Sequence, residues 1–227
     1  MPPPAQTRPL PGRAEPPARA PSLAPPPTVA APQPSNPAAP PVDHFGLALY
    51  YQRIGDFDSA LAEYRVLLEH DDKSAEVHNN LGLLYADRGE GDEAVKQFQA
   101  AIAIDPQSVH AHNNLGVAYM RANRLADAAA QFRIALAADP RVIDQLVNLA
   151  LVQKANGRTV EAKDLLERAV RIDPRNAGSH YNLAVVADES GEADVAIEHY
   201  RAFLKYGAVA QNDLAVQVRA RLAALGG

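Results

Sequence analysis

Apolar and polar residues recur with a period of 34 along most of this chain. From Pro41 to Ala210 the sequence divides without a gap into five units: 41–74, 75–108, 109–142, 143–176 and 177–210. The seventh position of every unit is Leu, at Leu47, Leu81, Leu115, Leu149 and Leu183. A period of about 20–50 residues predicts a stack of similar structural units that bury their apolar faces against one another.

Small and large apolar residues hold fixed places within each unit, and this predicts two closely packed helices. The eighth residue is Ala or Gly, the twentieth is always Ala, and the twenty-fourth is Tyr, Phe or Leu. Small residues let two helices approach each other, and the large residue fills the space between them.

The turns between the helices have their own residues. Four units have Gly at the fifteenth position and the third has Asn123, and both residue types tolerate the left-handed conformation that ends a helix. An Asp-Pro pair closes the second, third and fourth units, because Pro disfavours helix in the residue before it.

This set of landmarks resembles the tetratricopeptide repeat (TPR) family over about three-quarters of the chain. The resemblance implies an all-α fold, a right-handed α-solenoid of five helix–turn–helix units. It also implies a concave groove, lined by the first helix of each unit, that binds a protein partner. A non-catalytic scaffold is therefore expected.

Two further segments flank the repeats. Residues 1–40 are rich in Pro and Ala, and sixteen of the nineteen prolines lie in 1–41, which predicts a disordered arm with a polyproline II bias. Residues 211–227 predict a capping helix, with apolar residues on one face at Leu214, Val218, Leu222 and Leu225.

Composition narrows the function further. The net charge is −5, so the basic surface typical of nucleic-acid binding is absent. The chain has no Cys, which excludes disulfides and thiolate metal sites. Without an apolar run of membrane-spanning length or a signal-peptide core, a cytoplasmic location is expected. A periplasmic location is the alternative if the assigned start misses a signal or anchor.

No catalytic motif is recognisable, and neither a cofactor nor a metal is expected. Histidines recur at the fourth position, at His44, His78, His112 and His180. They fall one per unit, roughly 10 Å apart along a stack of helices, which is too far to share a metal ion. We expect them to be buried structural residues between the two helices of a unit.

The sixth position predicts the binding residues. It carries a ladder of asparagines, Asn80, Asn114, Asn148 and Asn182, and a carboxamide can both donate to and accept from a peptide backbone. The ladder is similar to that in the TPR superhelix of O-linked N-acetylglucosamine transferases, although the catalytic domain is missing here. An alternative is that Asn is simply common at this position in the family. The other candidate partner-binding residues are Asn79, Asn113, Leu83, Val117, Arg121, Leu151, Lys154 and Tyr181.

One mode of ligand binding known in this family is not expected here. Co-chaperone TPR domains hold the tail of a heat-shock chaperone through basic residues that are missing here in both possible frames, so no such clamp is expected. The favoured function is a scaffold for a protein or peptide partner. One alternative is a regulatory or substrate-selecting module for a separate enzyme, and another is an assembly factor for the envelope or for pili.

Overall fold

The computed structural model describes residues 42–207 and 212–226, and all secondary structure in these ranges is α-helical. The predicted Pro-rich arm lies outside the described residues. The first helices of the five units are α1 (His44–Ile54), α3 (Ala75–Asp87), α5 (Val109–Arg121), α7 (Ile143–Ala155) and α9 (Ala177–Glu189). The second helices are α2 (Phe57–His70), α4 (Gly91–Ile104), α6 (Leu125–Ala138), α8 (Thr159–Ile172) and α10 (Ala193–Gly207). The last helix is α11 (Asn212–Leu225).

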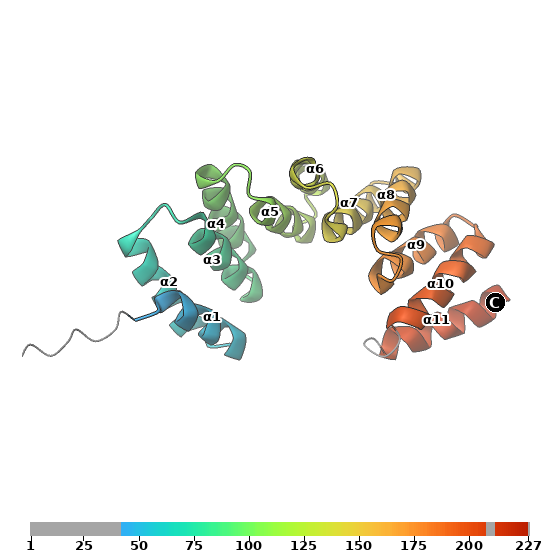
Figure 1. Ribbon diagram of the computed structural model, residues 1–227, viewed down its shortest axis with the longest axis horizontal. Coiled ribbons are helices and arrows are strands. Elements are labelled where there is room, and N and C mark those ends of the chain that lie inside the picture. Colours follow the sequence, from blue (N-terminus) through green and yellow to red (C-terminus); the bar gives the residue numbers. More distant parts are fainter. Residues whose placement is uncertain (1–41, 208–211, 227) are drawn as a thin grey trace, which may run out of the picture. The chain divides into compact units, whose positions relative to one another are not determined.

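The helices pack in chain order, as the sequence predicts. Each first helix contacts the second helix of its own unit, and each second helix contacts the first helix of the next unit. Figure 1 shows these pairs following one another from α1 to α10. Contacts that skip one helix join α3 to α5, α5 to α7 and α7 to α9. The five units therefore form an α-solenoid in which the first helices are neighbours on one face.

Polar residues fix where the helices begin, and positive backbone angles fix the turns. At the fifteenth position φ lies between 73° and 80° in the four glycines and is 57° at Asn123, so the predicted left-handed turn is confirmed. Five helices begin with a side-chain oxygen that accepts a hydrogen bond from the backbone N–H three residues later, at Asp43, Asp56, Ser74, Ser108 and Asn176.

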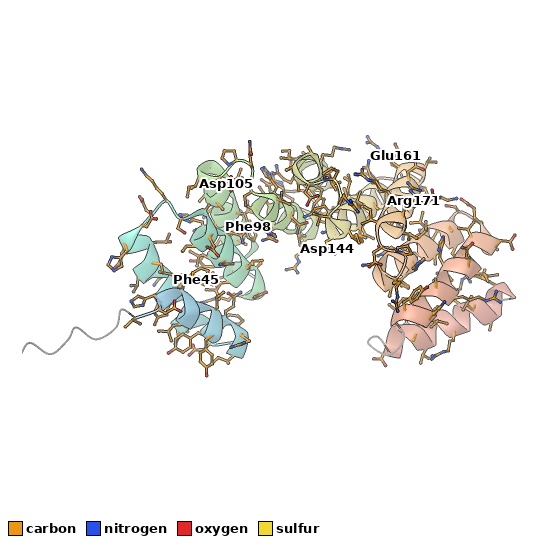
Figure 2. The ribbon with its side chains drawn as sticks, viewed as in Figure 1. Phe45, Phe98, Asp105, Asp144, Glu161 and Arg171 are labelled. Carbon is orange, nitrogen blue, oxygen red and sulfur yellow. The ribbon has the colours of Figure 1, made fainter. Side chains whose placement is uncertain are left out.

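The close packing of the two helices in a unit requires a small residue at the eighth position. A Cβ atom added to Gly82 would lie 2.5 Å from the ring of Phe98, and one added to Gly116 would lie 2.6 Å from the ring of Phe132. Phe98 is labelled in Figure 2, and both rings are at least 99% buried. In these two units, any residue larger than Gly at the eighth position would push the two helices apart.

A fourth-position histidine links the two helices of its own unit to the turn that ends the preceding unit. In the third unit, Nδ1 of His112 lies 2.7 Å from Oε1 of Gln131 on the second helix, and Nε2 lies 3.0 Å from the carbonyl oxygen of Pro106 in the preceding turn. The structural role is therefore supported, but complete burial is wrong for two of the four. His112 and His180 are 5% and 6% exposed, whereas His44 and His78 are only partly buried.

The last helix covers the end of the fifth unit. Ala215, Val218 and Leu222 of α11 are buried in one cluster with Tyr200 and Phe203 of α10. Its opposite side is exposed and mainly polar or small, with Asp213, Gln217, Arg219 and Ala220. The helix thus replaces the first helix of a sixth unit and presents a more polar surface outward.

The helices of the described residues are all too short or too polar to cross a membrane. In the same residues, His, Asp and Glu side chains do not gather in groups of three or more that could hold a metal ion.

Candidate functional site

The candidate binding surface is the first-helix face, which we define as positions five, six, nine, twelve and thirteen of α1, α3, α5, α7 and α9. Position nine lies three or four residues from each of positions five, six, twelve and thirteen, so within a unit these five positions form one stripe along the helix. The direct contacts of α3 with α5, α5 with α7 and α7 with α9 bring the stripes of units two to five together.

The asparagine ladder is linked from unit to unit. Nδ2 of Asn114 donates to Oδ1 of Asn79 at 2.9 Å, and Nδ2 of Asn148 donates to Oδ1 of Asn113 at 3.3 Å. Each bond joins the sixth position of one unit to the fifth position of the unit before it. Two ladder asparagines are therefore not wholly free for a ligand, because they also tie α3 to α5 and α5 to α7.

The fifth position decides which asparagine is linked. The residue 35 positions before Asn80 is Phe45, and the one before Asn182 is Val147, and neither side chain can accept a hydrogen bond. Asn182 instead donates to the carbonyl oxygen of Gly178 in its own helix at 2.9 Å. Asn80 makes no side-chain hydrogen bond within the described residues.

The linked pairs keep free hydrogen-bonding groups that complement a peptide bond. Oδ1 of Asn114 keeps its lone pairs, and Nδ2 of Asn79 keeps its two N–H groups, because neither atom has a partner among the described residues. A linked pair therefore offers an acceptor on one unit and a donor on the next. The pair Asn148 and Asn113 repeats this arrangement one unit further on.

A polar cavity of about 660 Å³ lies on this face between α3 and α5. The carboxylates of Glu76 and Asp105 belong to its lining, and neither forms an ion pair in the described part of the chain. Asp105 is labelled in Figure 2, at the end of α4. Together the lining residues carry negative charge and carboxamides, and they are Ala75, Glu76, Asn79, Asn80, Leu83, Asp105, Ser108, His110 and Asn114.

An apolar socket of about 80 Å³ adjoins the polar cavity and shares Leu83 and Asn114 with it. Leu83 and Val117 are half-buried in the socket and pack on the cluster that contains Phe98. The side chains of Asp87 and Arg121 stand at its rim with opposite charges. Six of the predicted residues thus line these two adjoining spaces: Asn79, Asn80, Leu83, Asn114, Val117 and Arg121.

The remaining predicted residues lie outside the two cavities and have other contacts. Lys154 is occupied by Glu189 of the next unit, with Nζ and Oε1 2.7 Å apart. The ring of Tyr181 packs against Phe203, with centroids 5.4 Å apart, so Tyr181 belongs partly to the core of the fifth unit. Leu151 is half-buried on α7.

Side chains also join the units through charged pairs, and the sequence analysis missed this. In the described residues, every ion pair that crosses from one unit to the next lies at one of the two ends of the stack. The pairs are Arg88 with Asp58, Lys154 with Glu189, Lys163 with Glu192, and Arg221 of α11 with Asp188. The recurrence of opposite charges 29 to 35 residues apart was the signal that could have revealed part of this.

Asp188 shows how strongly one such pair is held. Its carboxylate accepts from Nε and Nη2 of Arg221 at 2.7 and 2.6 Å, and from the hydroxyl of Tyr200 at 3.2 Å. The hydrogen bonds and charge of Arg221 hold the pKa of Asp188 below its usual range. Burial, together with the charge of Asp188, raises the pKa of Tyr200 to about 12.

The fold and this face define a helical-repeat protein with a surface of the kind that holds another polypeptide. Models of the "TPR repeat" match residues 82–123, and models of the "Tetratricopeptide repeat" match residues 109–142 and 147–213. The chain belongs to the tetratricopeptide repeat family. Members of this family bind protein partners and are typically non-catalytic.

Solved structures share the fold at low identity. MamA is 22% identical and has a TM-score of 0.65, over 73% of this chain and 97% of MamA. PilF from Pseudomonas aeruginosa is 22% identical with a TM-score of 0.68, over 80% of this chain and 90% of PilF. PilW, described as a type IV pilus biogenesis factor, is 23% identical with a TM-score of 0.67, over 80% of this chain and 91% of PilW. The comparison with curated protein sequences gave no match.

Proposed function

We propose that this protein is a non-catalytic scaffold that binds an extended segment of a partner protein on its first-helix face. The observation that carries the proposal is the repeated Asn–Asn pair. Each pair leaves a free acceptor and a free donor on neighbouring units, and an extended backbone presents its N–H and C=O groups to such a surface without regard to side-chain identity.

The two cavities suggest what the segment carries. An aliphatic side chain fits the apolar socket at Leu83 and Val117. The unpaired carboxylates of Glu76 and Asp105 favour a Lys or Arg side chain in the polar cavity beside it. We therefore expect a partner segment in which a basic residue lies close to an aliphatic one.

The test begins by identifying the partner through affinity capture with mass spectrometry and mapping its bound segment with a peptide array. Titration calorimetry then compares variants. Asn80→Ala should weaken binding several-fold without a change in melting temperature, because Asn80 has no internal hydrogen bond to lose. Asn156→Ala, on an exposed asparagine outside the first-helix face, is the matched control and should bind normally.

The double variant Asn114→Ala with Asn148→Ala should bind more weakly still. It should also lose stability, about 0.5–1.5 kcal/mol for each inter-unit hydrogen bond. If the affinities of Asn80→Ala and of the double variant equal that of the original protein, the ladder has no part in binding. On the array, replacing the basic residue of the segment by Glu should abolish binding, and unchanged binding would contradict the role of Glu76 and Asp105.

A second candidate is the assembly of an envelope or pilus machine. The fold matches to PilF and PilW, which extend over at least nine-tenths of those chains, support it. A regulatory module for a separate enzyme is the other alternative. The same capture experiment separates them, since it would return pilus components in one case and a single enzyme in the other. Captured pilus components would also favour the periplasmic side of the envelope over the cytoplasm.

A further inference from the structure

The two ends of the solenoid differ in what covers them. In units two to five, the first helix is covered by the second helix of the preceding unit. At the tenth position this covering buries Leu84, Val152 and Val186 to at least 99% and the smaller Ala118 of the third unit partly. Tyr50 occupies the same position in the first unit and is 48% exposed. In the described part of the chain, no helix stands in the place of a preceding unit.

The uncovered side of α1 carries a continuous stripe. Its members are Asp43, Leu47, Tyr50 and Ile54, at the third, seventh, tenth and fourteenth positions. Their spacing of four, three and four residues places them on one line along the helix, as in the seam of a coiled coil. Ile54 is 57% exposed, and Leu47 is less buried than its four counterparts. We call this line the α1 stripe.

The opposite end of the solenoid does not complement this stripe. Helix α11 covers the last unit, and the one large apolar residue exposed on its described part is Val216. A head-to-tail stack of copies would place the apolar stripe against polar residues. A second α1 stripe, by contrast, offers the same apolar residues at the same spacing.

The charges select one orientation of two stripes. Asp43 begins α1 and Arg53 lies near its end, and neither forms an ion pair in the described residues. Oδ1 of Asp43 accepts from the N–H of Gly46, and its Oδ2 remains free. Two parallel helices would bring like charges together. Two antiparallel helices bring each Asp43 to the Arg53 of the other copy.

We propose that the α1 stripe is the contact between two copies of this chain, packed antiparallel about a two-fold axis. The four-three-four spacing of the stripe is the same in both directions about the midpoint between Leu47 and Tyr50. Leu47 therefore meets the second copy's Tyr50, and Asp43 meets the end of the second copy's α1 at Ile54, beside Arg53. The ring of Tyr50 lies edge-on to Tyr51 at 5.6 Å between centroids, which holds it in place for this contact. The contact is small, so the dimer is weak and depends on concentration.

The first measurement is the mass of the full chain by sedimentation equilibrium between about 1 µM and about 500 µM. The mass should rise towards that of a dimer. Tyr50→Glu should raise the dimer dissociation constant at least tenfold without unfolding, because its side chain is already half exposed. Val216→Glu on α11 is the matched control and should leave the constant unchanged.

Charge variants test the orientation. Asp43→Asn keeps a residue that caps α1 but removes its charge, and Arg53→Gln removes the opposite charge. Each should weaken the dimer, and the double variant should be no weaker than the single ones, since both remove the same pair.

Cross-linking gives a geometric test, since the chain has no Cys of its own. A mixture of the Leu47→Cys and Tyr50→Cys variants should form mainly the mixed disulfide, rather than either symmetric one. Three results would each overturn the proposal. The full chain could stay monomeric over the whole concentration range, Tyr50→Glu and Val216→Glu could have equal effects on the dissociation constant, or the symmetric disulfides could form in preference to the mixed one.

Discussion

At the scale of single residues, the fourth and twenty-third positions of each unit form a pair whose members change together. His44 faces Glu63, and His78 and His112 face glutamines. In the fourth unit both positions are Leu, and Leu146 is fully buried. A polar residue on one helix is thus met by a polar residue on the other, because a buried polar group without a partner is costly.

The fifth unit has two histidines in this pair, His180 and His199, with their Nδ1 atoms 3.0 Å apart. Nε2 of His180 lies 3.1 Å from the carbonyl oxygen of Pro174 and must donate to it. In the neutral pair His180 therefore accepts from His199 at Nδ1. Protonating both rings would set two N–H donors against each other.

We predict that this pair makes stability depend on pH. Burial, followed by the charge of His180, lowers the pKa of His199 below its ordinary value of about 6.5, despite opposing effects of Glu198 and Glu167. The unfolded chain then binds more protons, so stability is full above that value and decreases as pH falls through the lower folded pKa. His199→Gln, which copies the second and third units, should reduce this decrease.

Urea unfolding at about pH 7.5 and about pH 5.5 measures the effect. The control is His110→Gln, since the side chain of His110 is exposed. Equal loss of stability on acidification in the original protein and in His199→Gln would assign the pH dependence to other groups, such as Asp188 at lower pH.

At the scale of helices, α11 stabilises the unit before it. Val218 and Leu222 bury their side chains against α10, and Arg221 is bound to Asp188 of α9. The cap thus holds both helices of the fifth unit, one through apolar contacts and one through a charged pair.

Removing residues 211–227 should loosen the fifth unit first. Each buried Leu or Val contributes roughly 1.5–3 kcal/mol, and in a stack of repeats the loss falls mainly on the nearest neighbour. Hydrogen exchange should show faster exchange in residues 177–207, with units two to four still protected, and the exposed face should promote association. Full protection of the fifth unit in the shortened chain would show that α11 caps nothing.

At the scale of the whole molecule, the repeat could be predicted from the sequence and the links between repeats could not. The small residues at the eighth position are set by contacts within a unit, as the close fit of Gly82 on Phe98 shows. The bond from Asn114 to Asn79 depends on how two units are placed against each other. The residues within one unit do not indicate how two units are placed against each other. The sequence therefore predicts free asparagine side chains, whereas Asn114 and Asn148 are hydrogen-bonded to the preceding units.

The N-terminal arm gives a prediction at the same scale. Residues 1–40 contain almost no large apolar side chains, so their removal should leave helical content and melting temperature essentially unchanged. Circular dichroism during heating of the full and shortened chains measures this. A drop of several degrees in the shortened chain would show that the arm contributes to stability.

The distribution of links between units has a consequence for the response to salt. Ion pairs join the first two units, the last two units and α11. In the described residues, units two to four are joined by hydrogen bonds between neutral side chains and by one from Arg168 to the carbonyl oxygen of Pro140. Dissolved ions screen exposed charges over about 10 Å at 0.1 M, but they do little to neutral hydrogen bonds. A rise in ionic strength should therefore loosen the stack from its two ends inward. The central units, which hold the asparagine pairs and both cavities, would keep their spacing. The binding surface would therefore keep its geometry at an ionic strength that already loosens the units at both ends of the solenoid.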